Sequence, residues 1–443
     1  MKSWLYDASL WGYWQGIKLV APFLEKANLF KEGRKNWKTE LQTKFEKIKQ
    51  PVAWFHCASL GEFEQGRPLI EAFKEHYPKY KILLTFFSPS GYEIRKNYDK
   101  ADVIMYLPLD TQKNAEFFIE TAKPKVVFFI KYEFWHHFIE ETHKRKIPLF
   151  SVSTIFRADQ HFFKGNNKRK EGKESNFSVK MLERFTHFFV QNEYSKDLLN
   201  SINIEKVSIT GDTRFDRVAT IVSQRKELPI IEKFIGQNKL LVVGSSWQED
   251  IEVIAPAFHK FRESFRENNK DKTDQNEKVK ITIASHNIAE SDLQKIEKAF
   301  DYLNIERYSK VNLNDKQSVQ NLQQADLLLI DNIGLLSSIY SYGDVAYIGG
   351  AFGKGLHNIL EAATFGMPIV FGNKNYQKFG EAVTLLAKKG AFSISNANEL
   401  EKLLNQLFKD DYFREQINEI TREYVIENTG ATSQIMDFCK TIL

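Results

Sequence analysis

The chain has 443 residues, 42% of them hydrophobic and 27% charged, so it is an ordinary globular protein with room for two or three domains and not a disordered chain. Its two cysteines exclude a disulfide framework and a Cys-His zinc site, and they favour a reducing compartment. The net charge of +5 arises within residues 1–50, which carry ten Lys or Arg and five acids, while the remaining residues sum to zero.

Residues 3–30 combine aromatic residues with the spacing of an amphipathic helix. One helical face would carry apolar residues at intervals of three and four, namely Leu10, Trp14, Ile17, Ala21 and Leu24. Tryptophan and tyrosine gather at the start of this segment and favour a membrane interface. Charged residues interrupt it too often for a membrane span, and no signal-peptide cleavage site follows. Two interpretations stay open: the helix lies in the inner leaflet beside the basic residues that follow, or it packs on the protein's own core.

From residue 51 onward, short apolar strands alternate with helical stretches, which predicts parallel sheets covered by helices. The predicted strands are 52–56, 81–86, 103–106, 126–130, 149–152, 187–190 and 207–210, followed by 240–243, 281–284, 327–330, 345–348 and 369–371. We therefore predict an α/β protein of two Rossmann-like domains with a cleft between them. The predicted parts are an N-terminal helix and basic segment at 1–50, a first domain at 51–222, a linker at 223–238 and a second domain at 239–443 with the C-terminal helices.

A carboxylate follows the first predicted strand at the edge where ligands bind in open α/β sheets. Residues 56–64 (HCASLGEFE) place Glu62 close to the start of the next helix. There it could take a proton from an incoming hydroxyl, or it could merely cap the helix. We expect His56 and Cys57 to be packing residues. Lys131 and Glu133 likewise follow the strand 126–130, where they could form a local ion pair.

Two segments of the second half predict a nucleotide site. Gly244, Ser245 and Ser246 follow the strand 240–243, where backbone N–H groups and two hydroxyls can hold a phosphate. Residues 349–363 (GGAFGKGLHNILEAA) form a glycine-rich loop that opens a helix. Its Asn358 and Glu361 would share one helical face, from which Glu361 could accept hydrogen bonds from ribose hydroxyls.

These motifs, taken in order, resemble the 3-deoxy-D-manno-octulosonic acid (Kdo) transferases of lipopolysaccharide synthesis. The resemblance runs from the aromatic N-terminus to about residue 390. It rests on blocks that occur in the family's order, namely 58–62 (ASLGE), 85–91 (TFFSPSG), 108–110 (PLD), 133–135 (EFW), 191–193 (QNE), 211–216 (GDTRFD), 344–361 and 371–372.

The resemblance implies a GT-B fold and an inverting transfer of Kdo from CMP-Kdo to the lipid A precursor (lipid IVA), with residues 51–222 binding the acceptor and 239–443 the donor. It assigns Glu62 as general base and Arg214 as a transition-state stabiliser, in a position where many members have Lys. It also implies the cytoplasmic face of the inner membrane. The implied CMP contacts are Ser285, His286, Ile333, Gly334, Leu335, Asn358, Ile359, Leu360 and Glu361, to which we add Ser245 and Ser246 from the pattern above.

Three positions depart from the family's pattern. Ser285 replaces an Arg of the CMP site, Lys131 replaces a Glu proposed to be catalytic, and Leu335 replaces a Glu. We expect Lys131 or Arg214 to supply the countercharge for the phosphate that the missing Arg would give.

Two other functions stay open from the sequence. The chain could be a GT-B transferase that uses a UDP-sugar on an envelope lipid, or a non-catalytic membrane-bound scaffold, although Glu62 argues against the scaffold. No Asp-x-Asp motif is evident, so we expect no metal and no cofactor. The basic residues of the N-terminus carry no recognisable nucleic-acid-binding module, so we expect no nucleic acid partner.

Overall fold

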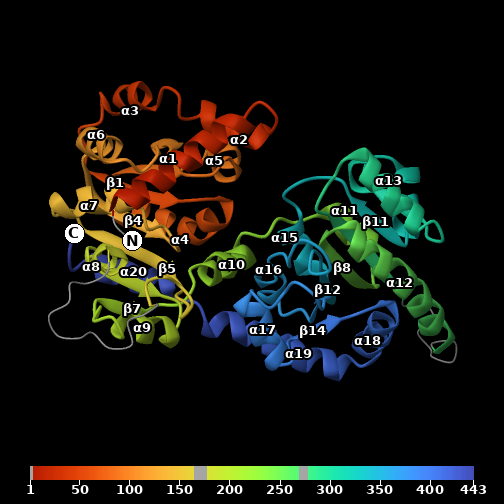
Figure 1. Ribbon diagram of the computed structural model, residues 1–443. Coiled ribbons are helices and arrows are strands. Elements are labelled where there is room, and N and C mark those ends of the chain that lie inside the picture. The colour runs from red at the N-terminus through yellow and green to blue at the C-terminus, as the bar shows by residue number, and fades with distance from the viewer. Residues whose placement is uncertain (1–2, 164–176, 269–277) are drawn as a thin grey trace. The chain divides into compact units, whose positions relative to one another are not determined.

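Two seven-stranded sheets, both entirely parallel, organise the chain in the computed structural model, which describes residues 3–163, 177–268 and 278–443 (Figure 1). Each sheet is the centre of one compact unit. The first unit comprises Met1–Arg217 together with Asn428–Leu443, and the second comprises Val218–Glu427. The predicted α/β fold of two Rossmann-like domains is confirmed.

The first sheet has the strand order β3-β2-β1-β4-β5-β6-β7. Its strands are β1 (Val52–Cys57), β2 (Lys81–Phe86), β3 (Val103–Tyr106), β4 (Pro124–Ile130), β5 (Leu149–Thr154), β6 (His187–Val190) and β7 (Val207–Ile209). Successive side chains point to opposite faces, so Trp54 joins the core on one face while Phe55 and Cys57 join the core on the other. Because both faces are covered by helices, β1 is buried along its whole length.

The helices of the first unit cover both faces of this sheet. They are α1 (Ser3–Val20), α2 (Glu25–Glu32), α3 (Trp37–Phe45), α4 (Leu60–His76), α5 (Pro89–Arg95), α6 (Gln112–Ala122), α7 (His136–Lys144), α8 (Phe177–Glu183), α9 (Glu193–Asn200) and α20 (Ala431–Cys439). Helices α3, α6 and α7 pack on the face that carries Trp54, and α4 packs with α20 on the face that carries Phe55.

The second sheet has the order β10-β11-β9-β8-β12-β13-β14. Its strands are β8 (Lys239–Ser246), β9 (Val279–Ser285), β10 (Ile305–Arg307), β11 (Leu327–Ile330), β12 (Val345–Ile348), β13 (Ile369–Gly372) and β14 (Ala391–Ile394). The accompanying α-helices are α11 (Pro229–Ile235), α12 (Gln248–Asn268), α13 (Glu290–Ala299), α14 (Lys316–Gln324), α15 (Leu336–Ile339), α16 (Leu360–Ala363), α17 (Gly380–Ala387), α18 (Ala397–Lys409) and α19 (Asp411–Glu427). The sequence did not predict β10 and β14, because these short edge strands mix apolar with polar residues.

The structure divides the chain differently from the predicted boundaries in two places. Residues 229–235 of the predicted linker form α11, which buries Ile231 and Phe234. The last helix, α20, belongs to the first unit and not to the second, as its blue ribbon among the elements of the first unit shows (Figure 1). Its buried Ile435 and Cys439 complete the core beside α4. Asp216 fixes this return, because its carboxylate accepts hydrogen bonds from the backbone N–H groups of Gly430 (2.6 Å) and Thr432 (2.7 Å).

Helix α1 packs by one face and leaves the other open. On the packed face, the Tyr6 hydroxyl donates to Asp110 (2.5 Å) and Asp7 lies 2.6 Å from the His137 Nε2. On the open face, Trp4, Trp11 and Leu19 are 63%, 67% and 74% exposed. The predicted helical stretch 3–30 breaks at residues 21–24, because Pro22 disfavours a helical conformation for the residue before it. Within the described residues, α1 and every other helix is too short or too polar to cross a membrane.

We expect three buried or partly buried histidines to make the stability of the protein sensitive to mild acid. Burial lowers the pKa of His136, His187 and His357 from 6.5 to about 4. Between these pH values the unfolded chain binds protons that the folded chain refuses, so stability is complete above pH 6.5 and falls as the pH drops towards 4. We expect urea unfolding to show this fall, and His187→Gln to reduce its slope. His76→Gln, at an exposed position, is the control. Stability that stays constant over this pH range would contradict the expectation.

Candidate functional site

Each sheet reverses its strand order at one point, and several of the predicted site residues follow the strands that flank these points. In the first sheet the reversal lies between β1 and β4, and in the second between β8 and β12. Loops at the carboxyl ends of parallel strands diverge at such a point and leave a crevice for ligands. Glu62 and Lys131 follow β1 and β4. Ser245 and the glycine-rich loop 349–358 occupy the corresponding ends of β8 and β12.

Glu62 lies half-buried in the first turn of α4. Ser59 precedes this helix as its N-cap residue, but its side chain does not bind the free backbone N–H groups of the helix. The Ser59 hydroxyl instead donates to the Glu62 carboxylate. Glu62 thus lies near the N-terminal, positive end of the α4 dipole. Ser59 and Glu62 have the spacing of a capping box, but Ser59 makes no capping hydrogen bond. The Glu62 carboxylate is instead held at the sheet edge by the Ser59 hydroxyl.

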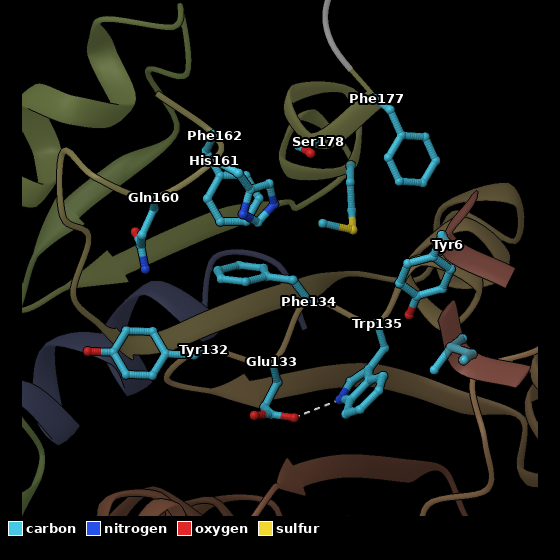
Figure 2. Close-up of a pocket in the computed structure, with 12 residues that line it drawn as sticks. Tyr6, Tyr132, Glu133, Phe134, Trp135, Gln160, His161, Phe162, Phe177 and Ser178 are labelled. Carbon is cyan, nitrogen blue, oxygen red and sulfur yellow. Dashed lines mark hydrogen bonds between the residues drawn. The ribbon is translucent and has the colours of Figure 1, made fainter. Parts of the chain in front are cut away.

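A buried polar network centred on Glu133 follows β4, the strand that pairs with β1. The Glu133 carboxylate accepts a hydrogen bond from Trp135 Nε1 (2.6 Å), drawn as a dashed line in Figure 2, and lies 3.0 Å from His56 Nε2. The other ring nitrogen of His56 lies 2.8 Å from Thr85 Oγ1. His56 is fully buried, as expected of a packing residue, but both of its nitrogens have polar partners. The partner of Glu133 is thus His56, and not Lys131.

Lys131 and Cys57 take different roles from this network. Lys131 has a φ of +70°, so the alternation of β4 ends there, and its ammonium lies 5.4 Å from the centre of the Tyr132 ring. Burial raises the pKa of Cys57 well above its ordinary value, so this thiol stays protonated and acts as a packing residue, as predicted.

Arg214 is held in place by a buried aspartate. Its Nε donates to Asp212 Oδ2 (2.9 Å) and its backbone N–H donates to Asp212 Oδ1 (2.9 Å) at the start of α10 (Arg214–Ser223). Gln65 of α4 donates to the same carboxylate (3.0 Å). Burial raises the pKa of Asp212, but the charge and hydrogen bonds of Arg214 outweigh this effect and hold the pKa below its ordinary value. The guanidinium of Arg214 is therefore fixed beside an ionised partner.

Tyr132 connects these groups electrostatically. Burial raises the pKa of its phenol, the charge of Arg157 opposes this, and the carboxylates of Glu62 and Asp212 reinforce it. The charge of Arg214 acts on the same phenol. Hydrogen bonds connect two of these groups, because Gln65, one turn after Glu62 on α4, donates to the Asp212 carboxylate that holds Arg214.

The second unit offers a close-packed turn after β8. The Ser246 hydroxyl is buried and has no hydrogen-bond partner within the described part of the chain. A Cβ on Gly349 would lie 2.4 Å from the Ser245 carbonyl oxygen, so only glycine allows the loop after β12 to approach this turn. The Asp250 carboxylate ties the two loops together, because it accepts from the backbone N–H groups of Trp247 (2.8 Å) and Gly350 (2.9 Å).

Trp247 is the centre of an aromatic stack that the sequence analysis missed. Its ring stacks on His286 at 4.1 Å, and its Nε1 donates to His357 (3.1 Å). The ammonium of Lys354 lies 4.0 Å from the centre of the Trp247 ring. Burial and the charge of Lys354 lower the pKa of His286. Trp247 directly follows β8 and Lys354 lies inside the predicted glycine-rich loop, so the position of each in the sequence was the available signal.

The remaining predicted contacts divide into exposed and buried residues. Asn358 is exposed, and its amide donates to Glu361 (3.1 Å). Ile359 and Leu360 are fully buried, so only their backbone could meet a ligand. Ile333 is 86% exposed, beside Gly334 with a φ of +88° and Leu335. Ser285 donates to the Ser246 carbonyl oxygen (3.3 Å), which places it next to the β8 turn. In the described residues, no group of three or more Cys, His, Asp or Glu is arranged to hold a metal ion.

Two sheets of this kind, each with its polar residues at the switch point, define a GT-B-like protein. Among solved structures, the UDP-GlcNAc 2-epimerase from Neisseria meningitidis has a similar fold, with a TM-score of 0.57 at 15% identity over 88% of this chain and 100% of that chain. Residues 35–217 match the family model described as 3-deoxy-D-manno-octulosonic-acid transferase (kdotransferase).

Curated relatives extend the match along the chain. A 3-deoxy-D-manno-octulosonic acid transferase from Chlamydia trachomatis is 23% identical over 92% of this chain and 90% of its own length. One from Aquifex aeolicus is 26% identical over 80% of this chain and 85% of its own length. A bifunctional glycosyltransferase/methyltransferase from Fusobacterium nucleatum is 25% identical over 92% of this chain, which spans 60% of that longer protein. The family model and these relatives support the predicted Kdo transferase family, and with it an enzyme that acts as a Kdo transferase.

Proposed function

We propose that, within the Kdo transfer of lipopolysaccharide synthesis, the protein takes Kdo from CMP-Kdo and passes it to the lipid A precursor (lipid IVA), with Glu62 as the general base. The observation that carries this proposal is the link between Glu62, which follows β1 at the switch point of the first sheet, and Arg214, whose partner Asp212 accepts a hydrogen bond from Gln65, one turn after Glu62. It combines a carboxylate that can accept a proton with a guanidinium that can neutralise a phosphate, as transfer from a phosphorylated donor requires.

The proposed step is an inverting displacement. The Glu62 carboxylate takes the proton of an acceptor hydroxyl as its oxygen forms a bond to the anomeric carbon of Kdo. The bond from that carbon to the CMP phosphate breaks, and CMP leaves with the electron pair. The Ser59 hydroxyl, which donates to Glu62, orients the carboxylate before the proton arrives. Arg214 stabilises the negative charge that develops on the leaving group.

We assign the donor to the switch point of the second sheet. Ser245 and Ser246 would bind phosphate oxygens, and the unpartnered buried hydroxyl of Ser246 supports this assignment. Asn358 and Glu361 are exposed enough to bind the ribose of CMP. Lys354 would supply the cation that Ser285 lacks, since it belongs to the same unit as Ser285 and lies beside Trp247 and His286. It replaces Lys131 in our proposal for this countercharge.

We place the enzyme at the cytoplasmic face of the inner membrane, with α1 lying in the interface. Its open face carries Trp4, Trp11 and Leu19, and exposed Phe23 and Leu24 follow it. Such side chains favour the boundary between lipid and water. Because the proposed acceptor is itself a membrane lipid, this surface would bring the first unit to its substrate.

Lys354 provides a specific test of the donor assignment. We expect Lys354→Ala to raise the KM for CMP-Kdo about tenfold, since a lost charge-assisted contact to phosphate is worth about 1.4 kcal/mol. Steady-state kinetics with varied donor would measure it. Lys374→Ala is the matched control, because Lys374 is also exposed but lies near Phe352 instead of Trp247. Equal KM values for both variants would remove Lys354 from the donor site.

A product assay tests the activity itself. Purified protein, dispersed lipid A precursor and freshly generated CMP-Kdo are mixed, and the products are weighed by mass spectrometry. We expect one or more additions of the Kdo mass, and the number of additions gives the number of sugars transferred. A parallel reaction with UDP-sugars tests the alternative donor class, and we expect no transfer from them. Transfer from a UDP-sugar, with none from intact CMP-Kdo, would overturn the proposal.

A further inference from the structure

An apolar pocket lies between α1 and the strand ends of the first sheet, and neither the family nor the proposed mechanism assigns it a ligand. Its volume is about 400 Å³, and residues from α1, from the segment after β4, from 160–162 and from α8 line it. Figure 2 shows the rings of Phe134, Phe162 and Phe177 around it, with Tyr6 on one side and Tyr132 on the other. Among the described residues that line it, none is a lysine or an arginine.

One wall of the pocket belongs to the helix that we place in the membrane interface. Tyr6 and Leu10 of α1 line the pocket, while Trp4 and Trp11 of the same helix are exposed on its other face. The Tyr6 hydroxyl donates to the buried Asp110, which also accepts the backbone N–H of Phe138 (2.9 Å), so this wall is firmly attached to α7. An apolar chain could therefore pass from a lipid surface into the pocket along α1.

The opposite side of the pocket adjoins the proposed chemistry. Tyr132 and Glu133 line it there, at the carboxyl end of β4. Strand β4 pairs with β1, and Glu62 follows β1 at the same edge of the sheet, so this end of the pocket adjoins the strand that leads to the proposed general base. The Glu133 carboxylate at this end already has polar partners within the protein, because Trp135 donates a hydrogen bond to it and His56 Nε2 lies 3.0 Å from it. A ligand with an apolar chain and a polar head would place its head at Glu62.

We propose that this pocket binds one acyl chain of the lipid acceptor and thereby positions the acceptor sugar at Glu62. The inference rests on the proposed function in one respect, namely that the acceptor is acylated. An acyl chain fits the aromatic and aliphatic lining, which gains from excluding water and whose described residues include no lysine or arginine for a headgroup phosphate. Binding a chain here makes recognition depend on acylation, so the enzyme distinguishes its lipid from a soluble phosphorylated sugar.

The kinetic test uses a variant of α1 in which a larger side chain fills the pocket. Leu10→Trp inserts a larger ring into the space, and we expect the KM for the lipid A precursor to rise at least about tenfold. The de-acylated disaccharide should be used equally well by Leu10→Trp and the unaltered protein, because it has no chain to lose. Ile94→Trp, at an exposed position of α5, is the matched control and should leave both KM values unchanged. An unchanged KM of folded Leu10→Trp for the acylated acceptor would overturn the inference.

A binding measurement separates this inference from the proposed function. Brominated myristate, kept below the concentration at which it forms micelles, should quench the fluorescence of Trp135, which lines the pocket. Trp135→Phe should lose that part of the quenching. Quenching without any Kdo transfer would support the pocket and contradict the function, whereas transfer to the acylated acceptor with equal quenching in Trp135→Phe would contradict the pocket alone.

Discussion

Replacing Glu62 by Gln should lower kcat for Kdo transfer about 10³-fold while leaving the KM for CMP-Kdo nearly unchanged. Gln has the size of Glu but cannot take the proton of the acceptor hydroxyl. The Ser59 hydroxyl can still donate to the amide oxygen, so the first turn of α4 should keep its structure. Initial rates at saturating substrate, measured by mass spectrometry of the product, check this expectation.

Glu64→Gln is the matched control for that variant. Glu64 lies on the same helix, is also half-buried and pairs with Arg95 at 2.7 Å. Its pair is a surface ion pair, which contributes little to stability, so its loss should change kcat less than twofold and unfolding only slightly. Equal losses of kcat in the two variants would show that Glu62 acts through the structure of α4 and not as the base.

Arg214→Ala should reduce both activity and stability, for two separable reasons. We expect kcat to fall about 10²-fold or more, because the leaving phosphate loses a fixed cation. We expect the free energy of unfolding to fall by about 3 kcal/mol, because buried Asp212 loses the partner that holds its pKa low. Urea unfolding and steady-state kinetics measure the two effects.

The double variant Arg214→Ala with Asp212→Asn separates them. Neutralising residue 212 removes the uncompensated charge, so we expect it to recover much of the lost stability. The rate should stay low, because no cation replaces Arg214. A double variant that regains the rate together with the stability would show that Arg214 serves only to hold the fold.

The sequence predicted the elements better than their assembly. The short runs 103–106 and 187–190 gave strands with the observed bounds, because consecutive apolar residues are a strong local signal for a buried strand. The return of α20 to the first unit has no such signal, since it depends on contacts between Asp216 and residues more than 200 positions away. The break of the N-terminal helix at Pro22 was a local signal that the helical spacing of the apolar residues concealed.

The candidate site shows the same limit. Strand ends located Glu62, Ser245 and the glycine-rich loop, because the carboxyl edge of a parallel sheet can be located once the strands are known. The pairs Glu133 with His56 and Arg214 with Asp212 combine side chains through geometry, and sequence spacing suggested Lys131 as the partner of Glu133 instead. The aromatic stack on Trp247 joins three separate loops, which no single motif could indicate.

The return of the last helix makes the second unit an insertion within the first. Residues 218–427 leave the first unit after Arg217 and rejoin it at Asn428, and Asp216 binds the N–H groups of Gly430 and Thr432 close to that point. The two ends of the second unit therefore lie close together. One uninterrupted stretch of the gene thus encodes the whole of this module, and recombination at two sites could exchange it. The donor specificity that we assign to it could then be inherited separately from the part that we assign to the lipid.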